Sequence, residues 1–135
     1  SVDSPELLSL INQRALDLGI VQAVLLEINI GGEQSKTGMA PEELPDILQA
    51  AADFPGVLIR GLMAIPPISV TEGGNRPYFA RMYQLYIDIS TKKYDNVCMD
   101  FLSMGMSGDF EDAIAEGSNM VLVGSAIFGE RTYPT

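Results

Sequence analysis

The chain has 135 residues, enough for one domain over residues 1–135, and its formal net charge of −10 argues against a nucleic-acid partner, because phosphates bind Lys and Arg. No apolar run approaches the roughly 20 residues of a membrane span, and the absence of histidine excludes imidazole catalysis and His-ligated metal sites. Cys98 is the sole cysteine, so no internal disulfide forms, and we expect a reducing, cytoplasmic setting.

Helical and strand patterns alternate from the first residues. Ser4 and Pro5 predict the start of a helix, as cap and first helical residue, and Gly19 is placed to end it. Residues 21–30 are nearly all apolar, as expected of a strand that is covered on both faces. A second helix is predicted within residues 41–53, with an irregular first turn because a proline cannot lie deep inside a helix.

The rest of the chain continues this alternation. Further strands are predicted at 57–65, 99–104 and 120–123, and further helices at 77–89 and 107–116. We expect Arg60-Gly61 to interrupt the first of these strands. Alternating strands and helices predict an α/β fold with a parallel sheet and right-handed crossovers. Ligands in such folds bind beyond the carboxyl ends of the strands.

Two neighbouring strand-to-helix turns made of Gly and Ser are the most informative feature. Ser107 follows an apolar strand that ends at Gly105, and Gly124-Ser125 follows the next strand. Glycine lets the backbone come close to a ligand, serine donates a hydroxyl, and free N–H groups at a helix start face an anion. We therefore predict that Ser107, Gly124 and Ser125 hold a phosphate group. For Ser107 taken alone, a plain helix N-cap remains an open alternative.

Four further side chains are candidates near these strand ends. Asn29 and Lys36 lie at or beyond the end of the first strand, where Lys36 either contacts an anion or remains a solvated loop lysine. Met63 ends its strand and either packs on a flat ring or fills the core. Met106 directly precedes Ser107 and is assigned to the same site. We predict no catalytic residue and no metal ligand.

Four segments together resemble the pyridoxal-phosphate homeostasis protein family, whose fold is similar to the N-terminal barrel of alanine racemase. These segments are 27–30 together with 35–38, then 60–66, 102–110 and 124–131. The resemblance implies a (β/α)8 barrel that carries pyridoxal 5′-phosphate (PLP) as a Schiff base on lysine. It also implies storage or delivery of the cofactor, with no established turnover reaction. The family's phosphate contacts correspond to Ser107, Gly124 and Ser125, and Met63 matches a residue beside the cofactor ring.

The chain departs from this family in two respects. The lysine-bearing Ala-Val-Ser-Lys-like motif of an early strand is absent, so the chain resembles only the last four strands of the barrel. A complete (β/α)8 barrel takes roughly 250 residues. Family members also usually carry Arg, facing the pyridine nitrogen, where this chain has Leu122.

A half barrel exposes two strand edges and an apolar sheet face, and exposed edges pair with other chains. We therefore expect either the missing N-terminal half or a second copy of the chain as a partner. Two alternatives to a cofactor-binding protein remain. One is a PLP-dependent enzyme similar to an amino-acid racemase, and the other is a truncated fragment without bound cofactor.

Overall fold

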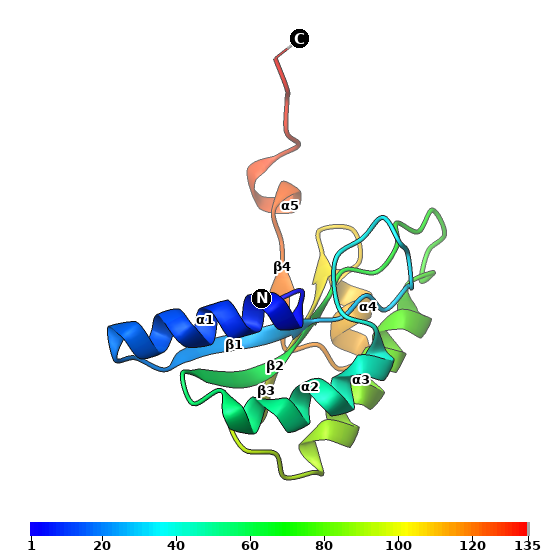
Figure 1. Ribbon diagram of the computed structural model, residues 1–135. Helices are drawn as coiled ribbons and strands as arrows, with labels where there is room; N and C mark the ends of the chain where they lie inside the picture. Colours follow the sequence, from blue (N-terminus) through cyan, green and yellow to red (C-terminus); the bar gives the residue numbers. More distant parts are fainter. Residues whose placement is uncertain (135) are drawn as a thin grey trace.

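The computed structural model describes residues 1–134 and contains one four-stranded parallel sheet with helices packed on one of its faces (Figure 1). Neighbouring strands follow the order β1-β2-β3-β4, and all three pairs are parallel. The predicted α/β class and parallel sheet are therefore confirmed. The strands are β1 (Gln22–Glu27), β2 (Val57–Ala64), β3 (Val97–Met106) and β4 (Met120–Leu122).

The helices begin and end largely where local sequence signals place them. The Ser4 hydroxyl accepts the Leu7 N–H at 3.2 Å, and Gly19 ends the first helix in the left-handed conformation. The predicted irregular turn before Pro45 is a short 3₁₀ segment. The α-helices are α1 (Pro5–Leu18), α2 (Leu44–Ala50), α3 (Arg76–Ser90), α4 (Phe110–Ala115) and α5 (Ser125–Phe128), and the 3₁₀ segments are η1 (Pro41–Glu43) and η2 (Ala51–Asp53).

Two details of the predicted elements are wrong. Helix α4 does not begin at Ser107, because β3 continues to Met106 and Asp109 occupies the cap position, where its Oδ1 accepts the Met106 N–H at 2.9 Å. Strand β2 is not interrupted at Arg60-Gly61 but runs through it, with a shift of register between Ile59 and Gly61. A bulge absorbs the irregularity without ending the strand.

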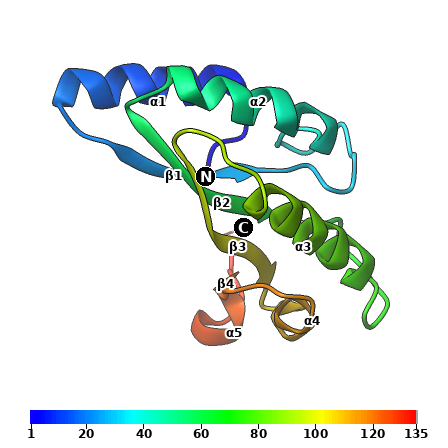
Figure 2. The same cartoon turned by 90° about the horizontal axis from the view of Figure 1, so that it is seen from below.

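The core lies between the sheet and its helices. Figure 2 shows α1 to α4 around one side of the curved sheet. Phe79 and Met82 of α3 are fully buried against the strands, as are Leu26, Leu62 and Leu102. Burial of this apolar surface, at about 25 cal/mol per Å², is the main favourable term in folding. No helix within residues 1–134 is long and apolar enough to cross a membrane.

Among residues 1–134, no helix covers the opposite face of the sheet, and the two edges of the sheet differ. At the β1 edge, Val2 forms a parallel bridge with Leu26, exchanging hydrogen bonds of 2.8 Å with Leu25 and Glu27. At the β4 edge, the strand is three residues long, and α5 and the following tail project away from the body (Figure 1). The sheet is thus open on one face and at β4.

Candidate functional site

The carboxyl ends of β3 and β4 bring the two predicted turns into direct contact. The Ser107 Oγ accepts hydrogen bonds from the backbone N–H groups of Gly124 and Ala126, each at 3.1 Å. Ser107 therefore does not cap its own helix α4; it holds the start of α5 instead. This contact spans seventeen to nineteen residues of sequence and ties the two turns together.

The Ser107 hydroxyl can donate a hydrogen bond while its oxygen accepts two. A serine oxygen has two lone pairs, and both are directed at the N–H groups of Gly124 and Ala126. Its own O–H is consequently free to donate to a further group. A Cβ built on Gly124 would meet no atom within 4 Å, so the space beside this turn is open. Ser125 is exposed next to that space.

The carboxylate of Asp109, two residues after Ser107, accepts hydrogen bonds from donors within the fold. Asp109 accepts the Met106 N–H at 2.9 Å through Oδ1 and the Asn75 side-chain amide at 2.9 Å through Oδ2. Asn75 is itself buried at the start of α3. Asp109 thus links the β3–α4 turn to α3, with both of its oxygens engaged.

Met63 and Met106 line one cavity of about 250 Å³ on the open face of the sheet. Met63 is half-buried and Met106 is 42% exposed, so neither belongs to the fully buried core. Leu122 lies in the wall of the same cavity. Leu122 makes this part of the cavity wall apolar.

Asn29 and Lys36 lie on a neighbouring loop, and the structure gives both of them partners there. The Asn29 amide donates to the carbonyl oxygens of Glu33 at 2.7 Å and Lys36 at 3.4 Å. The Lys36 ammonium donates to the Pro66 carbonyl at 3.0 Å and lies 3.8 Å from the Glu33 carboxylate. Lys36 lines a second cavity, of about 490 Å³, whose wall also contains Met106. Asn29 holds the loop that carries Lys36.

Two polar residues before β4 position the Gly124 turn and were not predicted as part of the site. The Ser118 hydroxyl lies 2.8 to 3.1 Å from the carbonyl oxygens of Leu102, Met104 and Met120. The Asn119 amide accepts the Leu102 N–H and donates to the Asp100 carbonyl, each at 2.8 Å. Their signal in the sequence is a polar pair directly before a short apolar strand. Together they fix β4 against β3.

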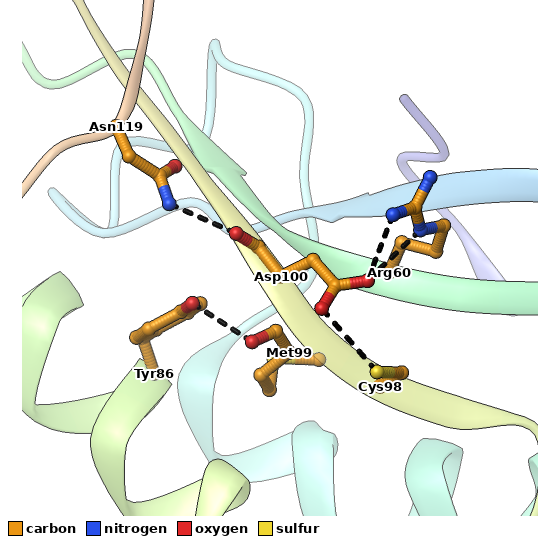
Figure 3. A network of polar contacts seen from close by, with 6 residues as sticks. All are labelled: Arg60, Tyr86, Cys98, Met99, Asp100 and Asn119. Atoms are coloured by element: carbon orange, nitrogen blue, oxygen red, sulfur yellow. Dashed lines mark hydrogen bonds and ion pairs between the residues drawn. The ribbon is translucent and has the colours of Figure 1, made fainter.

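A polar network crosses the middle of β2 and β3 (Figure 3). The Arg60 guanidinium donates through Nε and Nη2 to one oxygen of Asp100, at 3.0 and 2.9 Å. The Arg60 hydrogen bond, and then the Cys98 thiol, lower the pKa of the Asp100 carboxyl. The hydrogen bond to Asp100, followed by its negative charge, raises the pKa of Cys98. At neutral pH the Asp100 carboxylate is therefore charged and the Cys98 thiol is protonated.

Tyr86 joins α3 to this region, and its loss is expected to destabilise the fold. Its hydroxyl donates to the Met99 carbonyl at 2.8 Å, and burial, followed by the Asp100 charge, raises its pKa. Tyr86→Phe should lower the free energy of unfolding at pH 7 by about 1 kcal/mol. Because the folded-state pKa is raised, the tyrosine's contribution is present below its unfolded pKa of about 10 and is lost as the pH rises through the folded value.

Urea unfolding at pH 7 and at about pH 10.5 tests this expectation. The matched control is Tyr83→Phe, since Tyr83 lies on the same helix and is 41% exposed. Equal stability of the Tyr86→Phe and Tyr83→Phe variants at pH 7 would contradict the assigned role of the Met99 hydrogen bond.

Comparison with known proteins defines the class to which this fold and site belong. The model of the alanine racemase N-terminal domain matches residues 1–132, so the chain belongs to that family. More particularly, it is 43% identical over 133 residues to the pyridoxal phosphate homeostasis protein of Aquifex aeolicus, which confirms the resemblance identified from the sequence. The match covers 98% of this chain and 58% of that protein.

Solved structures agree with this assignment. A protein of unknown function from Bifidobacterium adolescentis superimposes with a TM-score of 0.85 at 40% identity, covering 95% of this chain and 51% of that one. PipY of Synechococcus elongatus, solved with PLP bound, superimposes with a TM-score of 0.76 at 30% identity, covering 96% and 59%. The chain therefore spans about half the length of the relatives it matches.

Proposed function

We propose that this chain is the phosphate-binding portion of a PLP-binding protein that stores or delivers the cofactor. The observation that carries the proposal is the joined pair of turns, in which the Ser107 hydroxyl ties the Gly124 turn to the end of β3. The bound PLP of PipY and the names of the curated relatives support the same cofactor for this chain.

Each candidate residue has a distinct part in the proposed site. Ser107 donates its free O–H to a phosphate oxygen, while Gly124 and Ser125 supply close backbone approach and a second hydroxyl. Met63 and Met106 form the apolar wall of the adjoining cavity, against which the flat pyridine ring packs. Leu122 in that wall cannot donate a hydrogen bond to the pyridine nitrogen. That nitrogen is therefore less polarised here than in a site where an Arg donates to it.

Asn29 and Lys36 contribute at the margin of this site. The Lys36 ammonium uses one hydrogen bond on Pro66 and retains donors toward the cavity that it shares with Met106. It therefore serves as an anion contact, while Asn29 keeps its loop in place.

The remainder of the proposed protein lies outside these residues. We infer that residues 1–135 correspond to the last four strands of a family barrel, since the relatives are about twice as long. The lysine that bonds covalently to the cofactor aldehyde then comes from the N-terminal half. When bound, PLP supplies an electron sink for amino-group chemistry.

The assigned phosphate contacts can be tested on this chain directly. PLP and inorganic phosphate should each shift the backbone amide resonances of Gly124 and Ala126, whereas pyridoxal, which lacks the phosphate, should not. Ser107→Ala combined with Ser125→Ala should weaken PLP binding by roughly tenfold or more, because hydrogen bonds to a charged group each contribute about 1.5–3 kcal/mol. Binding is measured by calorimetry.

Ser90→Ala is the matched control, because Ser90 ends α3 at the opposite end of the sheet and bonds only the local Ile87 carbonyl. It should leave PLP affinity unchanged. Unaltered PLP affinity in the double variant would refute the assigned roles of Ser107 and Ser125.

We further propose that the protein has no catalytic cycle of its own. The relatives are named homeostasis proteins, and racemisation requires acid–base groups on both faces of the bound substrate. The full-length PLP-loaded protein incubated with L-alanine is therefore expected to yield no D-alanine. Chiral chromatography of the product decides between this proposal and the racemase-like alternative.

A further inference from the structure

Ser103 of β3 is a polar side chain in a largely apolar cavity, and the site described above does not use it. Its neighbours along the strand, Leu102 and Met104, are buried against the helices, so the alternation of the strand turns Ser103 to the opposite face of the sheet. There Ser103 pairs in register with Met63 of β2, and it lines the cavity of about 250 Å³ together with Met63 and Met106. Ser103 therefore faces the space that the proposed function assigns to the pyridine ring.

The Ser103 hydroxyl is free to bind a ligand. Among residues 1–134 it has no hydrogen-bond partner, and no buried side-chain oxygen there lacks one, so the Ser103 oxygen is accessible from the cavity. Ser118 differs, because its hydroxyl lies 2.8 to 3.1 Å from three backbone carbonyl oxygens. A serine hydroxyl offers one donor and two acceptor sites, and those of Ser103 all remain available.

Other side chains of this cavity cannot replace Ser103 as a hydrogen-bond donor to a ring. Within the described residues, no charged side chain lines the cavity, and the other hydroxyl in its wall belongs to Ser1, which is exposed at the first residue. Arg60 lines the adjoining cavity of about 210 Å³, where both of its hydrogen bonds go to Asp100. A polar ring atom enclosed beside Met63 therefore lacks a protein partner unless Ser103 supplies one, and an unpaired polar atom weakens binding.

We propose that the Ser103 hydroxyl donates a hydrogen bond to the ring nitrogen of PLP, an inference that rests on the proposed function. The ring oxygen of PLP lies beside the aldehyde carbon and can hydrogen-bond within the molecule, whereas the ring nitrogen needs an outside partner. A protonated ring nitrogen calls for a carboxylate, and none lines this cavity among residues 1–134. The unprotonated nitrogen is an acceptor, and a neutral hydroxyl is a suitable donor to it.

The spacing of Ser103 and Ser107 suits the two ends of one ligand. Ser107 follows Ser103 by four residues, so the two lie at most about 14 Å apart along the chain. A phosphate held at Ser107 directs its methylene group and ring down β3 toward Ser103, with a hydrogen bond at each end of the molecule. Met63 and Met106 line the space into which the ring extends. Ser107 thus selects the phosphate, and Ser103 selects a ring that contains nitrogen.

Equilibrium dialysis of the full-length protein tests this inference with two ligands, PLP and the analogue in which C–H replaces the ring nitrogen. The unmodified protein should bind the analogue about three- to tenfold more weakly than PLP, the loss typical of one neutral hydrogen bond. Ser103→Val should bind the two ligands equally. Ser103→Thr is the matched control, because threonine has the shape of valine but keeps the hydroxyl, and it should retain the preference for PLP. Both β-branched side chains suit a strand, and circular dichroism checks that the fold is retained.

Two results would overturn the role of Ser103. One is equal binding of PLP and the analogue by the unmodified protein, and the other is the same ratio of the two affinities in Ser103→Val and Ser103→Thr. Failure of the proposed phosphate site gives a different result. Ser107→Ala combined with Ser125→Ala should weaken both ligands by the same factor and preserve the preference for PLP, whereas unchanged affinities in that variant would refute the phosphate site and leave the ratio test of Ser103 intact.

Discussion

Replacing Gly61 with alanine is expected to lower the free energy of unfolding by about 3 kcal/mol or more. Gly61 is buried at the centre of β2 and pairs with Phe101 of β3, and a Cβ at this position would overlap the Phe101 carbonyl oxygen. The obstructing atom belongs to the backbone of a paired strand, so no side-chain rotation can relieve the overlap. The strands must separate locally, at the place where the sheet changes register.

Thermal and urea unfolding measure this loss, and Gly108→Ala provides the control. Gly108 lies in the turn after β3, and a Cβ there would meet no atom within 4 Å. Gly108→Ala should change stability by no more than about 0.5 kcal/mol. If Gly61→Ala proved as stable as Gly108→Ala, β2 and β3 would not pair as closely as described.

The order of strands and helices could be predicted because each boundary depends on neighbouring residues. Ser4, Gly19 and Pro45 act within one or two turns of their own positions, and the structure confirms the boundary that each one predicts. Gly61 misled the prediction for the same reason. A glycine inside a strand looks like an interruption locally, whereas here the close approach of a neighbouring strand requires it.

The site was predictable only in part, because its decisive contacts join distant residues. Two Gly- and Ser-containing turns after consecutive strands indicated a common rim, and the structure brings Ser107 and Gly124 together. The identity of the α4 cap depends on Asn75, which is 34 residues before Asp109 and secures its carboxylate. Local preference favours Ser107 and Asp109 equally well as a cap. The contact with Asn75 is a long-range one that no local pattern reveals.

Replacing Phe79 with alanine is expected to cost about 3–5 kcal/mol, the other large effect that the fold predicts. Phe79 of α3 is fully buried and is the largest side chain in the core. Its removal leaves a cavity between α3 and the sheet that the strand backbones cannot fill. Because α3 begins at Asn75, whose amide holds Asp109 next to the Ser107 turn, loosening α3 also loosens the proposed phosphate site.

Phe128→Ala is the matched control for Phe79→Ala. It makes the same chemical change at a side chain that is 86% exposed, so it creates no cavity in the core. We expect it to alter stability by no more than about 0.5 kcal/mol in urea unfolding at the same protein concentration. In Phe79→Ala, amide hydrogen exchange should accelerate both in α3 and at Met106, whose N–H bonds to Asp109. Faster exchange in α3 with unchanged protection at Met106 would show that the Asn75–Asp109 contact does not transmit the change. The rim that holds Ser107 would then depend on β3 and β4 alone.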